Sequence, residues 1–252
     1  MTATTQGEQL KQDIDQANRL HKAGRLADAE EAYLSVLSRL PDHPEILRLL
    51  GLLKHQAGDR DAAIDYLSRS IQRAPGNGRA LESLGCLFKE AGRDQEANAC
   101  FERAIECNPE QRSAFYNLGM TLAGSDGRLA QAVEAFERAV ALDGSDPLAR
   151  GALASALLKI GQPEPALTHI DAVLSRDAGD VAALAHRVAA LAQLGRLDEI
   201  DQLADLDSMI RVTRFKGDRT FATANELNRQ LARNIIDHPD LGAEKTTVNG
   251  MD

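Results

Sequence analysis

Six glycines divide most of this chain into nearly equal lengths. They are separated by 34, 34, 35, 34 and 34 residues, at Gly24, Gly58, Gly92, Gly127, Gly161 and Gly195. A constant period of this length predicts a repeat architecture, in which one supersecondary unit recurs and buries its apolar side against its neighbours. This period constrains the fold more than the length of 252 residues does, because a stacked array grows by adding repeats and not by enlarging one core.

Other residue types keep a fixed distance from these glycines. The fifth residue after each of the first five glycines is alanine, at Ala29, Ala63, Ala97, Ala132 and Ala166. The ninth residue is aromatic or aliphatic, at Tyr33, Leu67, Phe101, Phe136 and Ile170. We infer that the glycine makes a turn, that the alanine lets two helices approach closely, and that the large residue fills the space between repeats.

Apolar residues recur at three- and four-residue steps on both sides of each glycine, which is the period of an amphipathic α-helix. Before Gly58, for example, Leu47, Leu50 and Leu53 form one apolar face. Each such helix is too short to be stable alone in water, so neighbouring helices must bury one another. The sequence therefore predicts one α-helical hairpin in each period, with the glycine as its turn.

The acidic composition limits the classes of partner. The formal net charge is −9, whereas recognition of a nucleic-acid backbone needs a basic face. We therefore expect no nucleic-acid partner. No apolar run reaches the roughly 20 residues that cross a bilayer, and the N-terminal residues lack the charged and apolar regions of a secretory signal. We expect no membrane association and a cytoplasmic location.

The repeats resemble those of the tetratricopeptide repeat (TPR) family, whose period is about 34 residues. Three repeats carry the resemblance, at residues 44–77, 78–111 and 112–146. The repeat at 78–111 matches best, at Leu81, Leu84, Gly85, Phe88, Gly92, Ala97, Phe101, Ala104 and Pro109. The resemblance implies an all-α fold, a right-handed α-solenoid of about six helix-turn-helix hairpins that ends in a C-terminal capping helix.

We expect the array to occupy residues 10–208, with weaker repeats at 10–43, 147–180 and 181–208. Terminal repeats lose part of the pattern because one side of each meets water. The next glycine would fall at position 229, which is Arg229, so the array ends before it. We predict a disordered N-terminus over residues 1–9. Over residues 209–252 we predict an extended segment, a helix near 221–237 and a flexible tail.

The sequence shows no pattern that carries catalysis. It contains no phosphate-binding loop, no GxSxG turn, no dinucleotide-binding fingerprint and no Cys/His cluster with metal-ligand spacing. His21 and His55 occupy the same place in adjacent repeats, but a helix spacing of about 10 Å is too wide for a shared metal. We therefore predict no catalytic, cofactor-binding or metal-binding residue in this chain.

In TPR proteins the first helix of each hairpin lines a concave groove, so the resemblance implies a peptide-binding face. The residues expected to line it are Asn18, His21, Arg48, Leu52, His55, Glu82, Lys89, Tyr116, Asn117, Met120, Ser155 and Leu158. The first half is polar with a basic bias, which suits acidic groups or a C-terminal carboxylate. The second half is small and apolar, which suits a helix or an extended apolar segment. The chain is thus expected to be a scaffold that binds a protein or peptide, with a homodimer as one alternative.

The residues after the array leave two further alternatives open. Residues 221–228, 231–241 and 246–250 resemble the segment that leads into the catalytic domain of bacterial proteins in which TPRs precede a 2-oxoglutarate/iron(II) dioxygenase domain. This chain would then be the recruiting or dimerising arm of a longer enzyme whose catalytic domain lies beyond residue 252. Alternatively, the helix near 221–237 makes an intramolecular contact with the apolar end of the groove and partly covers it.

Overall fold

The computed structural model describes residues 3–125 and 127–203, and these residues form twelve α-helices. They are α1 (Ala3–Lys22), α2 (Leu26–Arg39), α3 (Pro44–Gln56), α4 (Arg60–Arg73), α5 (Gly78–Glu90), α6 (Asp94–Cys107), α7 (Arg112–Ala123), α8 (Leu129–Leu142), α9 (Pro147–Lys159), α10 (Pro163–Leu174), α11 (Val181–Gln193) and α12 (Leu197–Leu203). The described ranges hold no strand, and the predicted all-α fold class is confirmed. The helix near 221–237, its flanking segments and any contact it makes lie outside the described residues.

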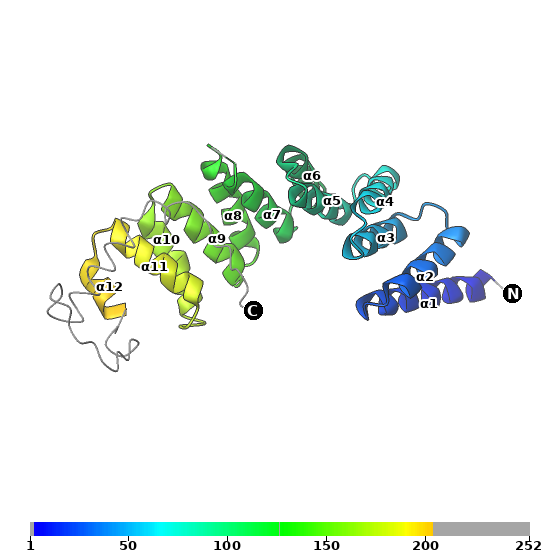
Figure 1. Cartoon of the computed structure of the whole chain (residues 1–252), viewed down its shortest axis with the longest axis horizontal. Coiled ribbons are helices and arrows are strands. Elements are labelled where there is room, and N and C mark those ends of the chain that lie inside the picture. Colours follow the sequence, from blue (N-terminus) through cyan, green and yellow to red (C-terminus); the bar gives the residue numbers. More distant parts are fainter. Residues whose placement is uncertain (1–2, 126, 204–252) are drawn as a thin grey trace, which may run out of the picture. The chain divides into compact units, whose positions relative to one another are not determined.

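Consecutive helices pair as hairpins, as Figure 1 shows. Helix α1 packs on α2, α3 on α4, α5 on α6, and α7 on α8. The first helices of the later hairpins begin at Pro44, Gly78, Arg112, Pro147 and Val181, which are the first residues of the predicted repeats. Helix α1 begins earlier than the pattern indicated, so residues 3–9 are helical and the prediction of disorder there is wrong. These residues are almost all polar, and they gave no apolar period from which a helix is read.

The chain divides into two compact units, Met1–Ala149 (unit 1) and Arg150–Asp252 (unit 2). In unit 1 each hairpin contacts the next through its second helix: α2 packs on α3, α4 on α5, and α6 on α7. In addition, α3 contacts α5 and α5 contacts α7, so these odd-numbered helices form one layer. In unit 2, α10 packs on α11 and α11 on α12. None of the described helices is long and apolar enough to cross a membrane.

The six periodic glycines all have a left-handed backbone, with φ between 69° and 81°. At Gly92, for example, the chain turns so that the Arg93 amide donates to the Phe88 carbonyl at 2.8 Å, which closes the C-terminal turn of α5. This conformation costs a residue with a Cβ about 1–2 kcal/mol, whereas glycine adopts it freely. The predicted role of the glycines as hairpin turns is confirmed.

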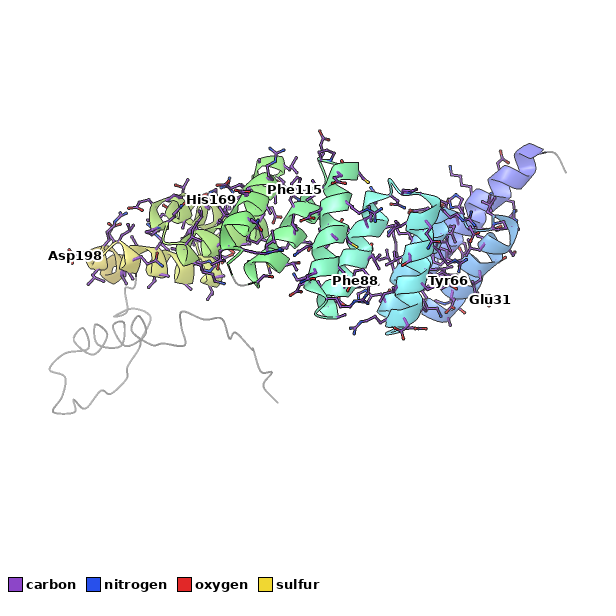
Figure 2. The ribbon with its side chains drawn as sticks, turned by 90° about the horizontal axis from the view of Figure 1, so that it is seen from above. Glu31, Tyr66, Phe88, Phe115, His169 and Asp198 are labelled. Carbon is purple, nitrogen blue, oxygen red and sulfur yellow. The ribbon has the colours of Figure 1, made fainter. Side chains whose placement is uncertain are left out.

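The core is built from the residues that keep a fixed distance from these glycines. The five periodic alanines, from Ala29 to Ala166, are completely buried, and Tyr33, Leu67 and Phe101 are equally inaccessible. Phe88 and Phe115, both labelled in Figure 2, are 9% exposed and belong to the core of unit 1. Burial of each large side chain contributes roughly 1.5–3 kcal/mol. The small and large positions therefore alternate along the stack, as the sequence predicts.

Candidate functional site

The odd-numbered helices of unit 1 carry most of the predicted binding residues. Because α3 contacts α5 and α5 contacts α7, their outward side chains share one surface. We term this surface the odd-helix face of unit 1; it consists of Asn18, His21, Arg48, Leu52, His55, Glu82, Cys86, Lys89, Tyr116, Asn117 and Met120. Met120 is 38% exposed and all the others are half-buried. Each side chain therefore keeps part of its surface for a ligand while its neighbours restrict its motion.

At the α1 end of this face, polar side chains bond to one another. The Tyr33 hydroxyl donates to Asn18 Oδ1 at 2.8 Å, and His21 Nδ1 lies 3.4 Å from the same hydroxyl. His21 Nε2 lies 3.1 Å from Oε1 of Gln56 in the next repeat. Burial raises the pKa of Tyr33 to about 12, so this hydroxyl stays protonated and serves as a donor. His21 thus helps to join the first two repeats, whereas Asn18 ties α1 to α2 within the first repeat.

The basic side chains on α3 already face carboxylates. Arg48 forms a two-pronged pair with Glu45, through Nε at 2.9 Å and Nη2 at 2.6 Å. Hydrogen bonding to Arg48 lowers the pKa of Glu45 and holds this carboxylate charged. His55 Nε2 lies 2.7 Å from Oε2 of Glu90 on α5. The basic bias that the sequence predicts for this half of the face is therefore offset by neighbouring acids.

Glu82 lies on α5 and accepts hydrogen bonds from the last residue of its own repeat, Gln111, and from Asn117 of the following repeat. Gln111 Nε2 donates to its Oε2, and Asn117 Nδ2 donates to its Oε1 at 3.1 Å. The Asn117 amide also lies 3.7 Å from the Cys86 sulfur. Sequence reasoning treated Asn117 and Glu82 as independent ligand contacts, and it missed Gln111. Gln111 and Asn117 lie 29 and 35 residues after Glu82, which is close to one repeat period, and this spacing could have identified the group.

The odd-helix face of unit 1 also carries apolar groups. Tyr116 packs against Phe136 with ring centroids 6.0 Å apart, which fixes the ring while leaving its outer part accessible. Met120 is one of the most exposed large apolar side chains of unit 1, and Leu52 lies on the neighbouring helix α3. Burial raises the pKa of Cys86 to about 11, so the thiol is neutral near pH 7. The face therefore combines hydrogen-bonding groups with apolar contact area.

The two remaining predicted residues belong to unit 2. Ser155 is half-buried on α9, whereas Leu158 is only 8% exposed and its carbonyl accepts a 3.2 Å bond from Gln193 Nε2. Leu158 therefore packs into the interior and offers little side chain to a ligand, because its apolar surface is used between α9 and its neighbours. Across residues 3–125 and 127–203, no three His, Cys, Asp or Glu side chains gather as a metal site requires.

Stacked helical hairpins of constant length define this chain as an α-helical repeat protein. Two TPR models match the sequence, one over residues 14–78 and 83–147 and the other over residues 125–194. The first alone covers more than half of the chain. The chain therefore belongs to the tetratricopeptide repeat family, and the resemblance inferred from the glycine period is confirmed.

Solved structures give the same fold. Pseudomonas aeruginosa PilF matches with a TM-score of 0.70 and 19% identity over 90% of this chain and 98% of its own. MamA matches with a TM-score of 0.58 and 24% identity over 68% of this chain and 93% of its own. YrrB, described as a TPR protein with an unusual peptide-binding site, matches with a TM-score of 0.61 and 21% identity, over 71% and 95%. At these identities the likeness establishes the fold alone. The search among curated proteins found no match.

Proposed function

We propose that this chain is a non-catalytic scaffold that binds a protein or peptide segment on the odd-helix face of unit 1. TPR arrays commonly mediate protein or peptide binding. The observation that carries the proposal is the direct contact of α3 with α5 and of α5 with α7, since it joins half-buried side chains of three repeats into one surface. YrrB, a TPR protein with an unusual peptide-binding site, has a similar fold, which supports the proposal of a binding scaffold.

The dimensions of the helices suit an extended segment. Packed helices lie about 8–10 Å apart, and an extended chain advances about 3.3 Å per residue. A segment of roughly nine residues therefore crosses three odd-numbered helices. Its alternate side chains meet Leu52, Tyr116 and Met120, and its backbone meets the polar groups between them. Fixed aromatic and aliphatic contacts of this kind supply most of the affinity of small interfaces.

The experiment is selection of peptides from a random nonapeptide library displayed on phage, with the purified chain as bait. The test variant is Tyr116→Ala/Met120→Ala, which removes apolar area from the odd-helix face. Truncation of two such contacts is expected to weaken the selected peptides at least roughly 10-fold in fluorescence anisotropy. The melting temperature of each variant is recorded, because Tyr116 also packs on Phe136.

The matched control is Leu34→Ala/Leu142→Ala, which truncates two exposed leucines on the even-numbered helices α2 and α8. These side chains are 42% and 37% exposed, close to the 38% of Met120. The control is expected to bind the peptides as the wild type does. Equal losses in both variants, or no enrichment of any peptide by the wild type, would reject the odd-helix face as the binding surface.

A second candidate function rests on the sequence of residues 221–241, which lies outside the described residues. Its resemblance to the segment before a 2-oxoglutarate/iron(II) dioxygenase domain favours a recruiting or dimerising arm of a longer enzyme. Sequencing the coding region past residue 252 tests this: the candidate requires a continuous frame with a His-x-Asp pair and a distant histidine. A stop codon there eliminates it. The cytoplasmic location and the homodimer remain predictions from the sequence.

A further inference from the structure

The charged groups on the odd-helix face of unit 1 are not equally compensated. Arg48 is bound at both prongs by Glu45, and its side chain is only 11% exposed. His55 faces Glu90 at 2.7 Å. Lys54, on the same helix as both, pairs with Glu30 at 2.6 Å. The cationic groups of α3 therefore already have carboxylate partners, and little positive charge is left there to attract an acidic ligand.

Glu82 differs because its hydrogen-bond donors are neutral. The side-chain amides of Gln111 and Asn117 donate one bond to each of its two oxygens. Within the described part of the chain, no lysine, arginine or histidine nitrogen lies at ion-pair distance from this carboxylate. A carboxylate has about four lone-pair sites, so roughly two stay available after these bonds. The charge of Glu82 is thus held in place but not neutralised.

The neighbours of Glu82 on the odd-helix face also bear on the binding of a cation. The Cys86 thiol, one turn further along α5, is neutral and half-buried, so it neither competes for a cation nor screens the carboxylate. Lys89 lies seven residues beyond Glu82, which is about 10 Å along the helix axis. Tyr116 occupies the corresponding place on α7 and directly precedes Asn117, whose amide bonds to Glu82. An aromatic ring and a carboxylate together favour a cationic side chain, whose methylenes lie on the ring while its charge reaches the acid.

We propose that the odd-helix face of unit 1 binds a partner segment that carries a lysine or arginine, and that the Glu82 carboxylate receives this cation. The proposal rests on the proposed function and names the chemistry of its ligand. Asn117 and Gln111 are positioning residues, because they orient the carboxylate before the ligand arrives. A preoriented, half-buried carboxylate gains more from a cation than a mobile surface acid does, since less side-chain entropy is lost on binding. This ligand is opposite in charge to the acidic one that the basic bias of the sequence suggests.

The test begins with the nonapeptides that the wild-type chain selects from the random phage library. A lysine or arginine is expected at one fixed position of the consensus. The consensus peptide and a twin with glutamine at that position are then synthesised with fluorescein labels. Loss of a charge-assisted bond is expected to make the twin bind about 10-fold more weakly to the wild type. Binding of both peptides is measured at low and high salt, because the preference is expected to shrink as ions screen it.

The decisive variant is Glu82→Gln, which keeps the shape of the side chain and removes its charge. It is expected to bind the two peptides equally, so the double-mutant cycle assigns the preference to this carboxylate. The matched control is Glu102→Gln, an exposed glutamate on α6, which is expected to keep the 10-fold preference. Circular dichroism melting confirms that both variants are folded.

The outcomes separate this inference from the function on which it rests. Selected peptides with a basic residue at one fixed position, whose tighter binding over the glutamine twin disappears only in Glu82→Gln, support both peptide binding and the role of Glu82. Peptides selected without a basic residue, or a preference that survives in Glu82→Gln, overturn the inference and leave peptide binding intact. Absence of any selected peptide rejects peptide binding, and the role of Glu82 with it.

Discussion

Gly85 on α5 faces the ring of Phe101 on α6 so closely that a Cβ at this glycine would lie 2.6 Å from Cε1 of the ring. A Cβ at Gly119 would likewise lie 2.6 Å from Cε1 of Phe136, and a Cβ at Gly51 would lie 2.7 Å from Cγ of Leu67. In these three hairpins the two helices therefore touch where a glycine of the first meets a large side chain of the second. This pairing fixes how deeply the large residue enters the hairpin.

Gly85→Ala should destabilise unit 1 because the completely buried ring of Phe101 has no free space into which it could move. Overpacking of this kind costs about 1–3 kcal/mol. Gly151→Ala is the control: no atom lies within 4 Å of its ideal Cβ, and replacing a helical glycine by alanine gains about 1 kcal/mol. Urea unfolding of the two variants should give free-energy changes of opposite sign. Two changes of the same sign would contradict the close packing.

Gly92→Ala tests the left-handed turn separately from packing. Its φ is +70°, and nothing lies within 4 Å of its ideal Cβ. The expected loss of about 1–2 kcal/mol in unfolding free energy therefore comes from the backbone alone. Gly92→Asn should lose less, since asparagine tolerates this conformation better. Gly76→Ala, in an open loop without a positive φ, should leave stability nearly unchanged. A harmless Gly92→Ala would show that the turn does not require glycine.

The three cysteines should differ in their rates of alkylation. Burial raises the pKa of Cys86 to about 11 and also raises the pKa of Cys100, whereas Cys107 is exposed. At pH 8 only about one Cys86 thiol in a thousand is a thiolate, the form that reacts. Timed iodoacetamide labelling with peptide mass mapping should therefore modify Cys107 first. In guanidinium chloride the three rates should converge. Equal rates in the folded chain would contradict the burial of Cys86.

The stability of unit 2 should fall as the pH drops below neutrality. Burial lowers the pKa of His186 in the folded state below its ordinary value of 6.5. Between this lowered pKa and pH 6.5, the unfolded state therefore binds more protons than the folded state. Stability is therefore highest above pH 6.5 and decreases as the pH falls toward the lowered pKa. Its Nδ1 is buried without a hydrogen-bond partner among the described residues, which is consistent with a neutral ring.

The measurement is urea unfolding of the wild type and of His186→Leu at pH 7.5 and pH 5.5. The variant should lose less stability between these pH values, because it removes one group that must take up a proton on unfolding. His169, whose pKa is also lowered by burial and by Arg150, accounts for part of the slope that remains. An unchanged slope in His186→Leu would exclude His186 as a contributor.

The glycine, alanine and large-residue positions could be predicted from sequence because each has a local steric reason to recur. Gly92 must turn, Ala97 must be small and Phe101 must fill space, and all three requirements repeat through the first five hairpins. The helical residues 3–9 could not be predicted in this way, because they lie before the first apolar period. The sequence pattern thus predicts the structure at positions where the backbone conformation or the available space accepts only one kind of residue.

The candidate site was less predictable because it depends on which side chains pair. The Arg48–Glu45 pair lies within one helix, at a separation of three residues, and could have been recognised from that spacing. The bonds from Asn117 to Glu82 and from His55 to Glu90 join residues 35 positions apart, so only the packing of one repeat on the next brings them together. The residues expected to line the first half of the face suggested a basic bias, whereas these pairings determine which charged group is left without an ion-pair partner.

The hydrogen bonds to Glu82 constrain how a repeat array can acquire a new binding specificity. Gln111 ends the repeat 78–111, to which Glu82 itself belongs, and Asn117 belongs to the repeat that follows, so the orientation of the carboxylate depends on two successive hairpins. Transplanting the hairpin 78–111 into another array would carry Glu82 and Gln111 along but leave Asn117 behind. The unit that determines the proposed recognition is therefore the junction of two successive hairpins. Transfer of this specificity to another array requires both hairpins together.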